Sequence, residues 1–362
     1  MSGPAGILIT IALFIVVLGS LVLVHELGHF LTARLARVRV LEFGVGFPPR
    51  AKVLRSRGET LYTLNWLPIG GFVKLEGEDG DDSGDPRSFV RASLPVKLII
   101  LAAGVAMNLL VAFLIFTVIA WLATPFVGLK YDQVQADSPA AAAGLQPGES
   151  IRGIDGQQDE FFGDANVLET LRAKAGQTVT LTIQRANGEV VPVTVTLRPQ
   201  DQIDNDHGPL GIGQLQATFF GSYSRDLPSA ISVGARETVH WFGVILAGLG
   251  DLVGQVVSNP TAPPPVAGPV GIATQISDVF FQGGPILTLY VAGILSANLA
   301  LVNSLPFPPL DGGRMLMILL KAIFGSRISV RAERLTYLVG FAFLFTFLIW
   351  VTVFDVFGRG PS

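Results

Sequence analysis

One apolar run near the start of the chain limits what this sequence can fold into. The run extends from about Pro4 to Val24 and continues to Leu35, beyond the ~20 residues that a helix needs to cross a membrane. It has no basic N-terminal region and no small-residue cleavage site, so we expect a retained membrane-spanning helix rather than a signal peptide. Half of the 362 residues are hydrophobic and 15% are charged, which is typical of an integral membrane protein.

Three ionisable residues lie inside this run, in the segment His25-Glu26-Leu27-Gly28-His29. Histidines four residues apart lie on one face of a helix and can bind one metal ion together. Glu26 is adjacent, where it can take a proton from a water molecule, as in the zinc hydrolases. The alternative is a pair of interfacial histidines on a membrane anchor. Ionisable groups are costly in an apolar segment, so we favour the functional interpretation.

A second motif, Asn303 to Arg314, combines polar residues with prolines and glycines. The chain has no cysteine, so any metal must be held by His, Asp or Glu. Asp311 lies where the prolines and glycines should break a helix, and we expect its carboxylate to be the third ligand. Three protein ligands and one water form the open coordination of a catalytic zinc.

The apolar runs predict four membrane spans, near 5–35, 98–124, 286–305 and 335–354. Basic residues follow the first and third spans, so the positive-inside rule places both metal-binding motifs on the inner side of the membrane. The helical segment 229–257 has only thirteen uncharged residues between Glu237 and Asp251. Because that is too short for a span, we predict a helix on the membrane surface.

The segment between the first two spans has strand character. Gly70-Gly71 separates two β-prone runs and predicts a tight hairpin turn. The edge of such a hairpin can pair with an extended substrate; the alternative is an ordinary cytoplasmic loop. The acidic run 76–85 is interpreted as a solvated segment. In the second span, Asn108 needs a polar partner, which is either a neighbouring helix or the active site.

Residues 126–200 have a soluble composition. A short helix closed by Gly144 precedes two alternating runs, 179–185 and 191–197, which are separated by Asn187-Gly188. This segment resembles a PDZ domain of bacterial envelope proteases, a module that binds an extended peptide as an added strand. A scaffold without a ligand is the alternative. The net charge of −3 gives no sign of nucleic-acid binding.

The two motifs in this order, with a PDZ-like segment between them, resemble the site-2 protease family and most closely its bacterial RseP-like members. The resemblance implies an intramembrane zinc metalloendopeptidase that cleaves transmembrane segments of membrane proteins, such as anti-sigma factors or remnant signal peptides. It implies the following roles: Zn²⁺ ligands His25, His29 and Asp311, catalytic Glu26, and substrate-binding Asn303, Gly70 and Gly71. Val105 stands where the family often has proline, which leaves a role for Asn108 open.

We therefore expect a multi-pass α-helical membrane protein with four transmembrane helices, an inserted α+β PDZ domain and a membrane-associated β-hairpin. Its expected location is the bacterial inner (plasma) membrane, with the PDZ domain extracytoplasmic and the zinc site toward the cytoplasm. The expected segments are 1–35 (first span), 36–96 (cytoplasmic β-hairpin region), 97–125 (second span), 126–200 (PDZ domain), 201–284 (linker and membrane-surface helix), 285–314 (third span with the Asp motif), 315–334 (cytoplasmic loop) and 335–356 (fourth span).

Three other functions fit parts of the pattern. One is a membrane zinc protease of another family, with a glutamate as third ligand. Another is a non-catalytic membrane adaptor that works through its PDZ domain. A transporter is the third, but the chain lacks the inverted repeats that would support one.

Overall fold

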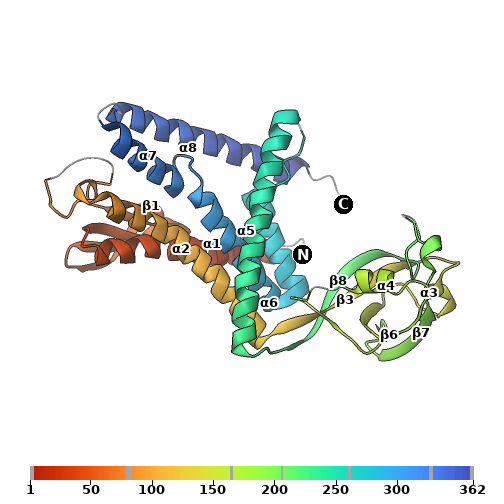
Figure 1. Cartoon of the computed structure of the whole chain (residues 1–362). Coiled ribbons are helices and arrows are strands. Elements are labelled where there is room, and N and C mark those ends of the chain that lie inside the picture. Colours follow the sequence, from red (N-terminus) through yellow and green to blue (C-terminus); the bar gives the residue numbers. More distant parts are fainter. Residues whose placement is uncertain are drawn as a thin grey trace. The chain divides into compact units, whose positions relative to one another are not determined.

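The chain folds into two units, which are described separately. The computed structural model describes residues 4–78, 84–163, 166–204, 207–259, 262–325 and 329–358 (Figure 1). One unit combines residues 1–116 with 234–362, and the other comprises residues 117–233. The second unit is thus inserted between two parts of the first.

Long helices dominate the first unit. They are α1 (Pro4–Leu35), α2 (Leu94–Leu122), α5 (Leu227–Ser258), α6 (Pro269–Ser304), α7 (Asp311–Phe324) and α8 (Val330–Val353), which continues into a π-helical turn (Phe354–Gly358). Among the described residues, five helices are long and apolar enough to cross a membrane: α1, α2, α5, α6 and the α8 segment. This composition is that of a multi-pass membrane protein.

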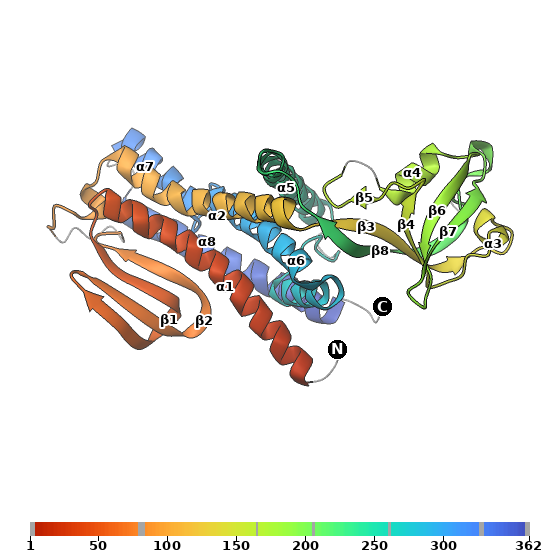
Figure 2. The ribbon, with the colours of Figure 1, turned by 90° about the horizontal axis from the view of Figure 1, so that it is seen from below.

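One of these five apolar helices, α5, is the helix that we expect on the membrane surface. Its apolar stretch is long enough for a span, so length alone does not exclude a crossing. In all views α5 runs across the common direction of α1, α2 and α8 (Figures 1 and 2). Trp241 Nε1 donates a hydrogen bond to the Tyr290 hydroxyl of α6 at 2.8 Å. The surface placement of α5 therefore stays a prediction.

Two segments of the first unit differ from the sequence-based expectation. The predicted loop 315–334 contains most of α7, an amphipathic helix that carries Lys321 in its last turn. The third span is longer than predicted, since α6 begins at Pro269 and bends at Gly284 (φ +72°) before Pro285. Only glycine adopts this backbone conformation without strain.

A sheet formed by β1 (Val40–Arg57) and β2 (Thr60–Leu75) packs beside α1. Residues 42–45 pair with 71–74 on one side and with 61–64 on the other. The predicted tight turn at Gly70-Gly71 is wrong, because both glycines lie inside β2 and the chain turns at 58–59 instead. Gly70 (φ +77°) lets β2 bend and return along β1. Among the described residues, 71–75 are left as a free edge of this sheet.

Near the sheet, the hydrophobic core of the first unit lies between the C-terminal part of α1 and the N-terminal part of α2. Its buried members are Phe30, Ala33, Val38, Val40, Leu75, Phe89, Ile100 and Leu101. The two helices approach closely because Gly28 has no side chain. A Cβ there would lie 2.4 Å from the Ala103 carbonyl oxygen. This close approach fixes the face of α1 that carries the histidines against α2.

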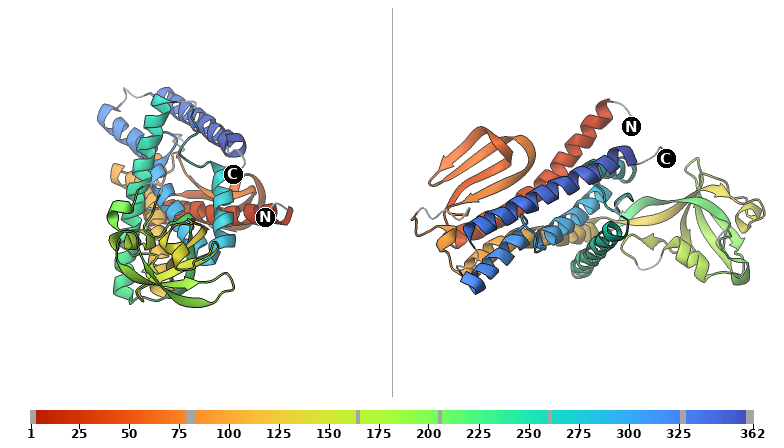
Figure 3. Two further views of the ribbon diagram at one scale, coloured as in Figure 1. Left: turned by 90° about the vertical axis from the view of Figure 1, so that its right-hand side faces the viewer. Right: turned by 90° about the horizontal axis from the view of Figure 1, so that it is seen from above.

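The second unit is an α+β fold. Its elements are β3 (Thr124–Val134), α3 (Pro139–Ala142), β4 (Ser150–Ile154), β5 (Asp159–Glu160), α4 (Val167–Ala173), β6 (Thr178–Gln184), β7 (Val190–Thr196) and β8 (Ile212–Tyr223). The strand order is β5-β3-β4-β6-β7, and β8 pairs with β3 (Figure 2). Figure 3 shows the same unit, coloured yellow to green, in two further views. Strands β6 and β7 pair on either side of Asn187-Gly188, where the sequence predicts a hairpin. Alternate residues of β6 are buried in the core.

The segment expected as a linker, 201–284, begins with more structure than predicted. Strand β8 pairs with β3 along almost its whole length, from Thr124↔Tyr223 to Val134↔Ile212. Residues 214–219, Gln-Leu-Gln-Ala-Thr-Phe, alternate polar and apolar residues, which is the pattern of a strand. The linker interpretation is therefore wrong for this part of the segment.

A buried carboxylate holds the β4 end of the second unit together. Glu149 is 4% exposed. It accepts hydrogen bonds from Arg185 Nη1 (2.6 Å), the Tyr131 hydroxyl (2.9 Å) and the Gln146 backbone N–H (3.1 Å). Burial by itself raises the pKa of Glu149, but these hydrogen bonds outweigh it and hold the pKa below its ordinary value of 4.5.

A carboxyl group whose pKa is lower in the folded state stabilises the fold above its ordinary pKa, and this stability is lost as the pH falls through the folded-state value. We therefore expect β4 and β6 to lose hydrogen-exchange protection below about pH 4.5. In Glu149→Gln, the protection at pH 7 should fall by about 2 kcal/mol and its pH dependence should flatten. Exposed Glu169→Gln is the control; equal protection in both variants would contradict this role.

Candidate active site

Two histidines on α1 begin the site. His25 and His29 are one helical turn apart, and both are buried, at 6% and 8% exposure. Their Nε2 atoms lie 3.1 Å from each other. The i,i+4 spacing on one helix face accounts for this convergence.

Asp311 reaches the histidines from the other end of the chain. Helix α6 ends at Ser304, a proline-rich loop follows, and α7 begins at Asp311. The first turn of α7 lies against this loop because Gly312 and Gly313 have no side chains; a Cβ on Gly312 would lie 2.2 Å from the Ser304 carbonyl oxygen. Asp311 Oδ2 is thereby placed 2.8 Å from His25 Nε2 and 3.2 Å from His29 Nε2.

This set of side chains fits a metal ion. Their ligand atoms lie within 4.8 Å of one another, and this is the metal-binding group found among the described residues. Ligand atoms of a tetrahedral zinc with bonds of about 2.0 Å lie ~3.3 Å apart, so the observed separations need changes of only a few tenths of an ångström. The carboxylate of this group comes from an aspartate, whereas the alternative prediction has a glutamate. Two imidazoles and one carboxylate leave a fourth position open, as catalytic zinc sites do.

Polar groups of α2 orient both imidazole rings. His29 Nδ1 lies 2.8 Å from the Ile100 carbonyl oxygen, so Nδ1 carries the proton and donates it, leaving Nε2 for a metal. Asn108 lies beside the imidazole of His25, with its Nδ2 3.4 Å from His25 Nδ1. The buried Oδ1 of Asn108 has no hydrogen-bond partner among the described residues. The two ends of an amide side chain are assigned from their hydrogen bonds. If Oδ1 and Nδ2 of Asn108 exchange places, Oδ1 accepts a hydrogen bond from His25 Nδ1–H, and both Oδ1 and the imidazole then have a partner. Asn108 is therefore part of the site as well as of the helix packing.

A glycine on α2 makes room for the two rings. A Cβ on Gly104 would lie 2.4 Å from His29 Nε2 and 2.7 Å from His25 Cε1. These distances are shorter than any ordinary contact, so the histidines occupy the space that a side chain at 104 would take. Gly104 and Asn108 are four residues apart and lie on the same face of α2.

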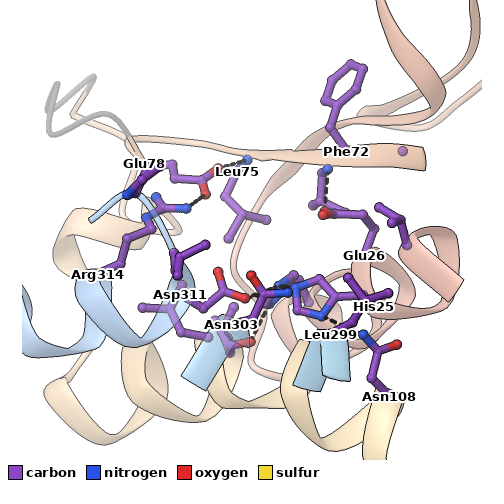
Figure 4. A pocket seen from close by; sticks show the side chains of 18 of the residues that line it. His25, Glu26, Phe72, Leu75, Glu78, Asn108, Leu299, Asn303, Asp311 and Arg314 are labelled. Carbon is purple, nitrogen blue, oxygen red and sulfur yellow. Dashed lines mark hydrogen bonds and ion pairs between the residues drawn. The ribbon is translucent and has the colours of Figure 1, made fainter. Parts of the chain in front are cut away.

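Glu26 lies in a cavity of about 440 Å³ that also contains the three ligands (Figure 4). Its Oε2 accepts a hydrogen bond from the Val73 backbone N–H on the free edge of β2, at 3.1 Å. The cavity therefore has the metal-binding group on one side and a strand edge on the other, with Glu26 between them. A carboxylate in this position can exchange protons with water or substrate within the cavity.

The other predicted site residues differ in their placement. Asn303 and Gly71 line the cavity, whereas Gly70 does not and serves the bend of β2. Sequence reasoning missed Gly104 and the Ile100 carbonyl, since a glycine or a backbone group in an apolar helix carries no chemical signal by itself. The spacing of Gly104 from Asn108 was the available clue.

Replacing Gly104 with alanine should displace the histidines, because its methyl group would overlap His29 Nε2. We expect zinc affinity to fall by about 10–100-fold or more, as when groups that orient metal ligands are removed. Zinc retained by the purified chain in chelator-buffered solutions measures this. Gly243→Ala on α5, where a Cβ meets open space, is the control, and equal zinc affinity in both variants would refute the packing argument.

Asn108 gives a second test of the metal-binding group. Asn108→Asp keeps an oxygen acceptor beside His25 Nδ1, so it should retain zinc. Asn108→Leu removes the acceptor, and zinc affinity should fall by about tenfold or more. Titration of each variant with zinc separates the two cases; a similar loss in both would mean that Asn108 acts through packing alone.

Comparison with known proteins places this site in a family. The sequence profile of peptidase family M50 matches residues 13–347. A candidate zinc metalloprotease of Clostridium perfringens is 33% identical over 338 residues, covering 93% of this chain and 95% of its own. The zinc metalloprotease RasP of Geobacillus kaustophilus is 29% identical, covering 95% of this chain and 96% of its own. A candidate zinc metalloprotease of Agrobacterium fabrum is 30% identical, covering 95% and 94%.

These matches extend over both motifs and both units, and the match covers most of each relative. The resemblance to site-2 proteases that the sequence motifs indicate is thereby confirmed, and this chain belongs to peptidase family M50.

Proposed function

We propose that this protein is a zinc-dependent endopeptidase that hydrolyses peptide bonds within or beside transmembrane segments of membrane proteins. The observation that carries the proposal is the convergence of His25, His29 and Asp311 at the ends of apolar helices. The relatives named as zinc metalloproteases support zinc as the metal. A buried site between apolar helices favours substrates that are themselves in the membrane.

Each polar residue of the cavity has a proposed task. His25, His29 and Asp311 hold zinc, which when bound supplies a Lewis acid that polarises the scissile carbonyl and acidifies a water. Glu26 takes the proton of the attacking water and returns it to the leaving amine. Glu26 lines the same cavity as His25, His29 and Asp311 but is not a member of the metal-binding group. Its carboxylate is therefore free to act as a general base.

The free edge of β2 is proposed to hold the substrate. A helix resists proteolysis because its carbonyl groups are hydrogen-bonded, so the substrate must be extended where it is cut. Residues 71–75 offer unpaired strand positions beside Glu26, and an extended chain can add to such an edge. Asn303 lines the same cavity and is proposed to hydrogen-bond the substrate backbone.

The membrane arrangement that we propose follows the distribution of arginines. Arg34, Arg37 and Arg39 follow α1, and this supports a zinc site toward the cytoplasm in a bacterial plasma membrane. The second unit would then be extracytoplasmic and act as a PDZ domain that admits substrates or binds a peptide. Anti-sigma factors and remnant signal peptides are the substrate classes that we propose.

The central test is Glu26→Gln. This variant should cleave a model single-span substrate about 10²–10⁴-fold more slowly, because it lacks the general base, while zinc content stays unchanged. Cleavage by the full chain in detergent and zinc content by atomic spectroscopy provide the two measurements. Cleavage as fast as wild type would refute the proposal.

A second variant tests the ligand set. Asp311→Ala should lose both zinc and cleavage, because only two protein ligands remain. An adaptor working through its second unit should keep its activity in both variants. Retention of zinc by Asp311→Ala would show that another carboxylate is the third ligand.

A further inference from the structure

A second carboxylate, that of Glu78, covers the free edge of β2 at Leu75, two residues after the position that Glu26 covers, Val73. Its Oε2 accepts a hydrogen bond from the Leu75 backbone N–H at 3.0 Å. Its Oε1 accepts one from Arg314 Nη1 at 2.6 Å. Glu78 and Arg314 both line the cavity of the metal-binding group (Figure 4). Their side chains are 17% and 27% exposed, so this is a largely desolvated ion pair.

The sequence alone gave Glu78 no such role. It lies in the acidic run 76–85, which was interpreted as solvated; residues 79–83 of that run lie outside the described residues. In the sequence, Arg314 only ends the second motif, Asn303 to Arg314. The structure brings them together across 236 positions of the chain. Arg314 lies one turn after Asp311 on α7, so the ion pair ties the strand edge to the helix of the third ligand.

The two carboxylates on the edge are held differently. N–H groups that point away from β1 occur at every second residue of the edge, and those of Val73 and Leu75 are covered by Glu26 and Glu78. Among the described residues, no lysine or arginine forms an ion pair with Glu26, whereas Glu78 is fixed by Arg314. An added strand that displaces Glu26 from Val73 disturbs no ion pair. Displacing Glu78 from Leu75 requires movement of a carboxylate whose other oxygen is held by Arg314 in a largely desolvated, charge-assisted pair.

We propose that Glu78, held by Arg314, is a positioning residue that ends the substrate-binding edge at Leu75. The proposal rests on the function proposed above and adds what sets the register of the substrate. An added strand pairs along 71–73 and stops at the covered Leu75 N–H. Because strand pairing shifts in steps of two residues when side-chain faces are kept, this stop selects which peptide bond lies next to the metal-binding group.

The register can be read directly, since the chain has no cysteine. Lys74 is an exposed residue of the edge, and the substitution Lys74→Cys places a single cysteine there. The same chain carries Glu26→Gln, which prevents cleavage. Single cysteines are then scanned along a model single-span protein whose membrane segment of about 20 residues contains a Gly-Pro break. Disulfide formation with the full-length chain under mild oxidation shows which substrate position lies opposite residue 74.

With Glu78 present, we expect one main crosslinked position. In Glu78→Ala, crosslinks should also appear two residues along the substrate, and Glu78→Gln, which keeps an acceptor for Leu75, should show a smaller shift. Glu59→Gln is the control, because it removes an exposed ion pair between Arg87 and the turn that joins β1 and β2. An unchanged crosslinking profile in Glu78→Ala would overturn the proposal, and so would loss of zinc, because the pair would then serve the metal site.

Cleavage by chains that retain Glu26 gives an independent reading. In Glu78→Ala, mass spectrometry of the products should show a second cut two residues from the first, and kcat/KM at the original bond should fall by about 10–100-fold, as for other small displacements of substrate. The same single cut at the wild-type rate would contradict the role of Glu78. Failure of the wild-type chain itself to cut would instead count against the function proposed above.

Discussion

The close contact between α1 and α2 is the constraint on which the site depends. Gly28 lets the backbones meet, and Gly104 leaves the space that the two imidazoles fill. The same face of α2 then supplies the Ile100 carbonyl and the Asn108 amide to the rings. Polar groups in an apolar helix bundle are stable only when each has a partner. The packing of two helices therefore also settles which ring nitrogens face the metal.

The remaining parts of the site are brought to this helix pair by breaks in regular structure. Helix α6 stops at Ser304, and the glycines after Asp311 let α7 start directly against the loop, so the carboxylate points back to the histidines. On the opposite side, the bend at Gly70 returns β2 along β1 and leaves 71–75 as an edge. The metal-binding side chains thus come from the middle of α1 and the start of α7, and the edge that an extended chain can pair with comes from β2.

Much of this site was predictable from the sequence, and the reasons for success and failure are physical. His25 and His29 were predictable because helical spacing fixes which side chains share a face, and Asp311 because helix-breaking residues surround it. The sheet was not, since the pairing of β1 with two parts of β2 depends on long-range contacts rather than on the local turn signal at Gly70. The edge-covering role of Glu78 was hidden for the same reason, because its partner Arg314 is distant in sequence. Strand β8 was not hidden in this way, since residues 214–219 alternate polar and apolar residues.

The meeting of His25 with Asp311 also limits the path of the chain between α2 and α6. Both α1 and α6 run toward the metal-binding group, whereas α2 starts beside it and runs away. If α1, α2 and α6 cross the bilayer, as we propose, the end of α2 and the start of α6 lie on the same side of the membrane, and the chain between them crosses the bilayer an even number of times or not at all. An insertion with this property can be lengthened, duplicated or replaced during evolution without inverting the catalytic helices. The fold thus separates the part that must be preserved for hydrolysis from a part that is free to diversify.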